Sequence, residues 1–170
     1  MLKSLDRFFF FKLFNLASEN RFIGRAAVLI TNYSANLFSF GYFLMLAYLL
    51  YNLNRKIIPF IIGPASTYFI VRLINYLYLR PRPFVSFEIE SLIDHTACAS
   101  FPSMHSSSAF VIAIAIYNIH PTLGKVMLGF ALITAVSRVM VGVHYPSDIL
   151  GGLILAILAN SIAFNFLINY

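Results

Sequence analysis

Three short segments of this sequence combine residue types suited to phosphate chemistry. They are Arg82-Pro83, then Pro102-Ser103-Met104-His105, then Ser137-Arg138 followed by His144 and Asp148. Arginine is permanently charged and offers forked donors that match phosphate oxygens. Histidine can act as a nucleophile toward phosphorus. Each segment lies beside a long apolar run, so together they predict a site that holds a phosphate at a membrane surface while a histidine attacks it.

The third segment contains the expected nucleophile. His144 and Asp148 are four residues apart, so on a helix they would share a face, and the carboxylate could hold the imidazole in one tautomer. The other ring nitrogen would then be free to attack. We therefore expect His144 to be the nucleophile and Asp148 the residue that orients it.

The remaining residues could supply charge and a proton. We expect Arg82 and Arg138 to bind phosphate. Ser103 and the backbone amides of Met104 and His105 could add donors at a helix start, where the dipole favours an anion. His105 would protonate the departing oxygen. Because the sequence contains no carboxylate cluster and arginines can stabilise the charge, we expect neither a metal nor another cofactor.

The composition places this chemistry in a membrane. The 170 residues are 60% hydrophobic and 11% charged, and the mean hydropathy is +0.82, which excludes a soluble domain with a polar surface. At this length we expect one domain, residues 1–170. The net charge of +6 is not gathered into a basic run, which favours a lipid bilayer and a phosphorylated substrate as partners over nucleic acid. Cys98 is the only cysteine, so no internal disulfide can form.

Uncharged stretches long enough to cross a bilayer predict an all-α membrane protein. A helix needs about 20 apolar residues to span. We expect five spans, at Ala26–Leu50, Ile57–Leu79, Ser106–Ile119, Val126–Val143 and Ile149–Leu167. The third is short, and Arg72 and Arg138 interrupt the second and fourth. The stretch Leu2–Ala17 mixes four charged residues with five phenylalanines, which predicts a helix lying in the interface over residues 1–20 and not a signal peptide.

The order of these elements brings the three segments to one side. The one long connection, residues 80–105, follows the second span, and the fourth span returns to the same face near Arg138. Gly151 and Gly152 lie within an uncharged stretch, so we expect a close helix contact there and not a phosphate-binding loop. His95 and His120, taken singly, are expected to be solvated loop residues.

The three segments together resemble the phosphatidic acid phosphatase type 2 superfamily. The resemblance covers roughly Arg72 to Leu153, and the surrounding sequence is most similar to small bacterial undecaprenyl-diphosphatases. It implies a helical bundle typical of that superfamily. It also implies a phosphohistidine and the following site residues: His144 as nucleophile, Asp148 behind it, His105 as acid, and Arg82, Ser103 and Arg138 as phosphate ligands.

The sequence departs from the family pattern at two positions. The family usually has a lysine seven residues before Arg82, and this chain has Asn75. Arg80 at the helix end, or Arg72 about one turn below Asn75, could replace the missing cation, and we expect Arg80 to do so. At Met104 the family commonly has glycine. The backbone amide remains available there, while the methionine side chain could narrow the pocket.

The resemblance implies a lipid phosphatase whose substrate is undecaprenyl diphosphate or lipid A 1-phosphate. Phosphatidylglycerophosphate and phosphatidic acid follow as alternatives. A protein that binds or transports lipid phosphates without catalysis is a further alternative, although binding alone has no evident need for His144 paired with Asp148. The oligomeric state stays open.

Two indications of membrane orientation disagree. The resemblance implies a bacterial inner-membrane protein whose site faces the periplasm. Five basic residues of the N-terminal segment would then lie outside, against three inside, namely Arg55, Lys56 and Lys125. The positive-inside rule favours the reverse. We follow the resemblance.

Overall fold

The computed structural model describes residues 2–168, and every regular element in that range is a helix. Met1, Asn169 and Tyr170, at the ends of the predicted 1–170 domain, lie outside the described residues. The helices are α1 (Leu2–Glu19), α2 (Arg21–Tyr51), α3 (Ile57–Leu77), α4 (Pro83–Ser86), α5 (Met104–Tyr117), α6 (Pro121–Met140) and α7 (Pro146–Ile168). The predicted all-α class is confirmed.

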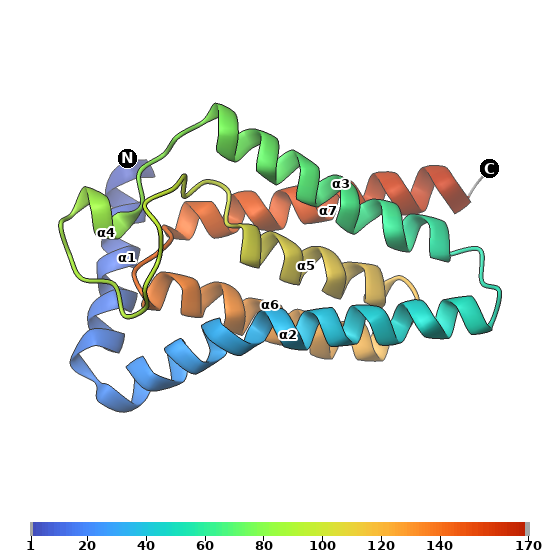
Figure 1. The fold of residues 1–170 in the computed structure, drawn as a ribbon, viewed down its shortest axis with the longest axis horizontal. Helices are drawn as coiled ribbons and strands as arrows, with labels where there is room; N and C mark the ends of the chain where they lie inside the picture. The colour runs from blue at the N-terminus through green and yellow to red at the C-terminus, as the bar shows by residue number, and fades with distance from the viewer. Residues whose placement is uncertain (1, 169–170) are drawn as a thin grey trace.

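The long helices agree with the predicted spans. Among the described residues, α2, α3, α6 and α7 are long and apolar enough to cross a membrane, and α5 is a shorter apolar helix of 14 residues. Figure 1 shows α5 in the middle of the bundle, where it packs against α2, α3, α6 and α7. Its buried positions are rich in alanine and serine, and such small side chains let neighbouring helices approach closely. The short predicted span is therefore the central helix.

Gly152 provides the close helix contact expected from the glycine pair. A Cβ built on Gly152 would lie 2.6 Å from Oγ of Ser107 and 3.2 Å from its backbone nitrogen. Any side chain at this position would therefore push α7 away from α5. The contact matters for function because it sits close to the start of both helices, where the candidate catalytic residues lie.

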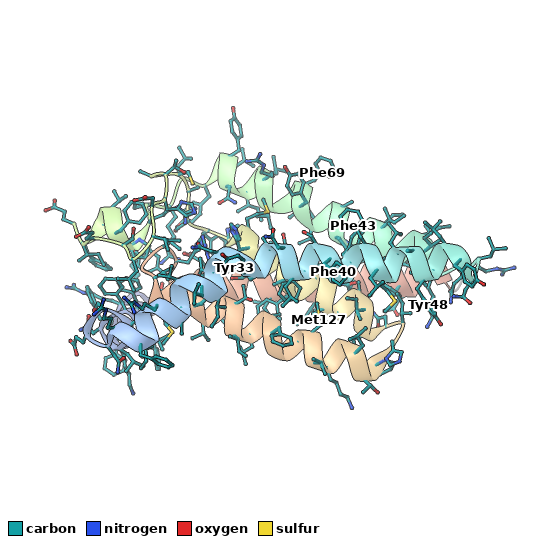
Figure 2. All side chains as sticks on the ribbon, turned by 60° about the horizontal axis from the view of Figure 1, so that its bottom comes forward. Tyr33, Phe40, Phe43, Tyr48, Phe69 and Met127 are labelled. Carbon is teal, nitrogen blue, oxygen red and sulfur yellow. The ribbon has the colours of Figure 1, made fainter. Side chains whose placement is uncertain are left out.

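The outer surface of the long helices is apolar. On α2, Phe40 and Phe43 are 69% and 64% exposed, and on α3, Phe69 is 69% exposed. Figure 2 shows Phe69 projecting from the outer side of α3. Large apolar groups on the outside of an apolar helix face lipid, so the chain is an integral membrane protein.

Helix α1 runs across one end of the bundle, beside α4 and the long connection (Figure 1). One face of α1 is buried, with Phe10 packing at ring-centroid distances of 5.7 Å from Phe87 and 5.8 Å from Tyr145. The other face exposes Phe8 and Phe9. Such a two-sided helix suits the predicted position in the membrane interface.

Candidate active site

The candidate site lies at the end of the bundle that α1 covers. The C-terminal ends of α3 and α6 and the N-terminal ends of α5 and α7 meet at this end (Figure 1). Arg80 and Arg82 follow α3, Arg138 lies in the last turn of α6, His144 precedes α7, and Asp148 lies in the first turn of α7. The structure therefore brings the three sequence segments together, as the order of the spans predicts.

A tight turn after α6 positions His144. Gly142 has a φ of +87°, a backbone conformation that glycine adopts without the steric cost borne by other residues. A Cβ on Gly142 would also lie 2.9 Å from the ring of Phe14 on α1. Both constraints demand glycine at this position. The turn directs the chain back toward the bundle, and His144 is only 2% exposed.

The His144 ring has two different neighbours at its two nitrogens. Nδ1 donates to the backbone carbonyl of Ser100 at 2.9 Å and lies 3.5 Å from Oδ2 of Asp148. A carbonyl oxygen can only accept, so this contact places the proton on Nδ1 and the lone pair on Nε2. A guanidinium nitrogen can only donate, so Nη1 of Arg82 donates to this lone pair at 3.2 Å. Nε2 can therefore attack once Arg82 turns this N–H to a phosphate, and the same guanidinium lies next to the attacking nitrogen.

Asp148 supports this arrangement from behind the ring. It is fully buried, and Oδ2 accepts from the Tyr145 amide at 2.8 Å. Its own backbone carbonyl accepts from the Ser103 amide at 3.2 Å. The sequence predicts Asp148 as the group that fixes the tautomer. The closer acceptor is the Ser100 carbonyl, which no side-chain pattern could have indicated.

Backbone carbonyls hold the guanidinium of Arg82 in one orientation. Its Nη1 donates to Val143 at 2.9 Å, its Nη2 to Ala99 at 3.2 Å and its Nε to Cys98 at 3.2 Å. The side chain is 5% exposed. Its Nη1 also donates to Nε2 of His144 and its Nη2 to Sγ of Cys98, both at 3.2 Å. All of these acceptors are neutral, so they orient the arginine without cancelling its charge, which suits a group that binds an anion.

Arg138 is a second buried cation with donors to spare. It is 2% exposed, and its Nε and Nη2 have no hydrogen-bond partner within residues 2–168. A buried charged donor without a partner is costly. The residues present therefore fit an anion that would accept from this guanidinium.

A cavity of about 600 Å³ opens beside Arg82 and His144, and Arg138 is not among the residues that line it. Ligand pockets commonly fall in the range of about 300–1,000 Å³. Its lining includes Arg82 and His144, the helix-start residues Met104 and His105, and several residues of α3, namely Tyr68, Arg72, Asn75 and Tyr76. The cavity thus joins the predicted nucleophile, the predicted acid and the outer part of α3.

Ser103 has a structural contact in this site. Its hydroxyl caps α5, accepting from the Ser106 amide at 3.5 Å, and lies 3.0 Å from the Ser106 hydroxyl. It is fully buried and does not line the cavity. Met104 and His105 do line it. The helix start therefore faces the cavity through the two residues that follow the cap.

The structure separates the two arginines considered as replacements for the family lysine. Arg72 and Asn75 both line the cavity. Arg80 does not: its Nη1 donates to Oδ1 of Asp148 and its Nη2 to Oδ2 of Asp6, both at 2.7 Å. The guanidinium is therefore held between Asp6 and Asp148, and Arg80 is not among the residues that line the cavity. Our expectation that Arg80 binds phosphate in place of the lysine does not fit this position.

Electrostatics keep His144 neutral. Burial, followed by the positive charges of Arg82 and Arg138, lowers the pKa of His144 well below its ordinary value of 6.5. Only the neutral ring has a lone pair for attack. Burial lowers the pKa of Arg80, but the charges of Asp148 and Asp6 outweigh it, so this pKa is raised.

Sequence reasoning missed two kinds of contributor. The carbonyls of residues 98, 99, 100 and 143 orient Arg82 and His144, and backbone groups carry no signal in residue type. Asp6 was also missed, although it is an acidic residue in a segment whose other charges are mostly basic. Among residues 2–168 no cluster of three or more His, Cys, Asp or Glu could hold a metal ion.

The sequence matches known proteins over this region. The sequence model described as the PAP2 superfamily matches residues 56–169. "Undecaprenyl-diphosphatase BcrC" of Bacillus subtilis (strain 168) is 44% identical over 94 residues, which are 55% of this chain and 49% of that protein. "Lipid A 1-phosphatase" of Rhizobium johnstonii is 39% identical over 59 residues, 35% of this chain and 24% of that protein. The chain thus spans about half the length of the first relative.

A solved structure has the same fold. The crystal structure of LpxE from Aquifex aeolicus aligns with a TM-score of 0.73, covers 95% of each chain and is 22% identical in sequence. This likeness concerns the helical arrangement alone. The family match covers more than half of the chain and includes all three segments, so the chain belongs to the PAP2 superfamily.

Proposed function

We propose that the protein is a membrane lipid phosphatase that removes a terminal phosphate from a lipid diphosphate or lipid phosphate. The observation that carries this proposal is the His144 ring, whose Nδ1 donates to the Ser100 carbonyl while Nε2 faces Arg82 in the cavity. A binding protein needs the arginines, but it has no use for a buried neutral histidine with a fixed tautomer.

The reaction proceeds in two displacements. Arg82 and Arg138 bind the phosphate oxygens, and Nε2 of His144 attacks phosphorus as the bond to the leaving oxygen breaks. His105 gives that oxygen a proton. Water then attacks the phosphohistidine, His105 takes up a proton from it, and inorganic phosphate leaves. In the first step the electron pair of the broken P–O bond leaves with the lipid oxygen. In the second step the electron pair of the P–N bond returns to Nε2 of His144.

The first candidate substrate is undecaprenyl diphosphate, which would give the monophosphate and inorganic phosphate. Support comes from the similarity to an undecaprenyl-diphosphatase and from a cavity that extends along α3 past a second cation, Arg72. Lipid A 1-phosphate is the second candidate, supported by the similarity to a lipid A 1-phosphatase. Both present an anionic phosphate at headgroup depth.

The proposed location is a bacterial inner membrane, with the cavity facing the periplasm. The site lies at the end of the bundle that α1 covers, and the exposed phenylalanines of α1 suit an interface at that level.

Phosphate release from purified protein tests this function. The panel contains undecaprenyl diphosphate, lipid A and glycerophospholipid phosphates, each assayed with and without excess EDTA. His144→Ala should lower kcat by roughly three orders of magnitude or more, and EDTA should leave the parent unaffected, as expected for metal-free chemistry.

Two results would contradict the mechanism. Phosphate trapped covalently on the His144→Ala variant would move the nucleophile elsewhere. Loss of activity in EDTA, restored by one divalent ion, would overturn metal independence. If no lipid phosphate is hydrolysed although one binds tightly, the non-catalytic alternative stands.

A further inference from the structure

We propose that Asp6 of α1 is a positioning residue for catalysis, acting through Arg80 and Ser147 on Asp148 and His144. This inference rests on the proposed function. Asp6 lies on the N-terminal helix, outside the three segments that define the family resemblance, and 142 positions before Asp148 in the sequence.

The contacts form a continuous chain from α1 to the nucleophile. Arg80 bridges Asp6 and Asp148 with contacts of 2.7 Å on each side. Asp148 in turn lies 3.5 Å from Nδ1 of His144. Every link joins a charged group to a charged or polar one, and Asp148 is completely buried. A displacement at Asp6 therefore has a direct route to the His144 ring.

Asp6 also accepts two hydrogen bonds from the start of α7. Its Oδ1 accepts from the Ser147 amide at 2.9 Å, and its Oδ2 accepts from the Ser147 hydroxyl at 2.6 Å. Because Ser147 immediately precedes Asp148, the Asp6 carboxylate fixes the backbone from which Asp148 projects. The Asp6 carboxylate thus holds the first turn of α7, which contains Asp148. It also holds Arg80, whose charge neutralises the carboxylate of Asp148.

Arg80 needs a second carboxylate to keep its orientation. Its guanidinium stacks over the Tyr145 ring at 4.0 Å, and its Nη1 also donates to the Ser147 hydroxyl at 2.6 Å. With Asp148 as its only anionic partner, the planar fork could rotate on the ring face. Asp6 holds the opposite nitrogen, so the guanidinium presents Nη1 to Asp148 in one geometry.

Helix α1 is well placed to act in this way because two further contacts attach it to the catalytic turn. Phe10 packs against Tyr145, and Phe14 packs under Gly142. These apolar contacts keep α1 docked when the charge of Asp6 is removed. Asp6→Asn should therefore leave the fold intact while loosening Asp148.

The test compares Asp6→Asn with Glu19→Gln, which removes a carboxylate from an exposed position at the end of the same helix. We expect Asp6→Asn to lower kcat about tenfold with KM nearly unchanged, and Glu19→Gln to match the parent. Arg80→Ala should lower kcat further, and Asp6→Asn should cost less in that background than in the parent, because the route through Arg80 is already broken and only the contacts of Asp6 with Ser147 remain to be lost.

A second measurement does not depend on activity. Nitrogen-15 NMR of histidine-labelled protein in detergent reports the tautomer and mobility of His144, assigned by comparison with His144→Ala. Asp6→Asn should broaden or shift the His144 signals, and Glu19→Gln should not. If the parent hydrolyses no lipid phosphate, the proposed function fails while this spectrum still decides the positioning role. An unchanged spectrum, or a loss confined to KM or to thermal stability, would overturn the role of Asp6.

Discussion

At the residue scale, the central feature is a histidine kept neutral beside two permanent cations. The pKa of His144 is lowered mainly by burial and then by Arg82 and Arg138. A lowered pKa means that the ring stays unprotonated below pH 6.5, where a solvent-exposed histidine would already be charged. The form of His144 that the proposed mechanism needs for attack is therefore maintained at mildly acidic pH.

This electrostatic arrangement predicts a pH dependence. Arg82→Ala removes one of the causes that lower the pKa of His144, so that pKa should rise and the acidic limb of kcat/KM should move to higher pH. Arg82→Lys keeps the charge but loses the fork, so it should lose activity without an equal shift of the limb. The measurement is kcat/KM against pH for both variants, with the His144 NMR titration as a check. Identical limbs in the two variants would show that Arg82 does not set the pKa.

A second residue-scale prediction concerns the cation along the cavity wall. Arg72 lines the cavity and lies three positions, about 4.5 Å of helix rise, from Asn75. Arg72→Ala should raise KM for a lipid diphosphate about three- to tenfold, since an exposed cation is worth less than a buried one. Asn75→Lys in the Arg72→Ala background should recover part of the loss.

The matched control for Arg72 is Arg55→Ala, which removes an exposed arginine from the opposite end of the bundle. It should leave KM unchanged. Equal KM values for Arg72→Ala and the parent on every lipid diphosphate tested would mean that the site works with Arg82 and Arg138 alone.

At the element scale, apolar patterning predicts most of the fold. The expected spans Ala26–Leu50 and Ile57–Leu79 lie close to α2 and α3, because a run of apolar residues free of charge has few alternatives to a membrane helix. The central position of α5 could not be read in the same way. The apolar residues of α5 do not gather on one face, so the sequence does not show which side is buried. The structure shows that α5 packs against α2, α3, α6 and α7, and these contacts explain how a helix of only 14 residues can form the centre of the bundle.

The contact between α5 and α7 gives a stability prediction with a built-in control. Gly152→Ala would place a Cβ 2.6 Å from Oγ of Ser107, so it should destabilise the protein by about 1–3 kcal/mol through overpacking. Gly129→Ala meets nothing within 4 Å and should be neutral or slightly stabilising, because alanine favours a helix. Thermal unfolding in detergent measures both. Equal melting temperatures would contradict the close approach of the two helices.

The side chains of the candidate site could be predicted from the sequence, but the backbone groups and the long-range charge pairs that hold them could not. His144, Asp148, Arg82 and His105 were named from their types and spacing. Arg80 was assigned to phosphate because the sequence cannot show that a carboxylate from a distant helix competes for it. Long-range pairing of single charged residues leaves no periodic pattern, and this explains why Asp6 was overlooked.

At the scale of the whole molecule, the candidate catalytic residues lie at one end of the bundle. The basic residues of α1 lie at that end, and Arg55 and Lys56 lie at the other. Near the far end, Nζ of Lys56 donates to the Asn118 carbonyl at 2.8 Å, joining the connection before α3 to the end of α5. In the proposed reaction, the orientation of the protein in the membrane decides which compartment supplies the water and receives the phosphate.

Cys98 provides a natural probe of that orientation, because it is the only cysteine, is exposed and lines the cavity. Burial raises the pKa of its thiol, but hydrogen bonds from Arg82 and Thr96 and the charge of Arg82 bring this pKa below its ordinary value. The thiolate fraction near neutral pH is therefore enhanced, which favours reaction with maleimides.

If the cavity faces the periplasm, a membrane-impermeant maleimide should label Cys98 in spheroplasts without permeabilisation, and inorganic phosphate should slow the labelling. Cys98→Ser should abolish it. Asn52→Cys in the Cys98→Ser background places the thiol at the opposite end and should be labelled only after permeabilisation. The reverse pattern would place the site on the cytoplasmic side, as the distribution of basic residues suggests.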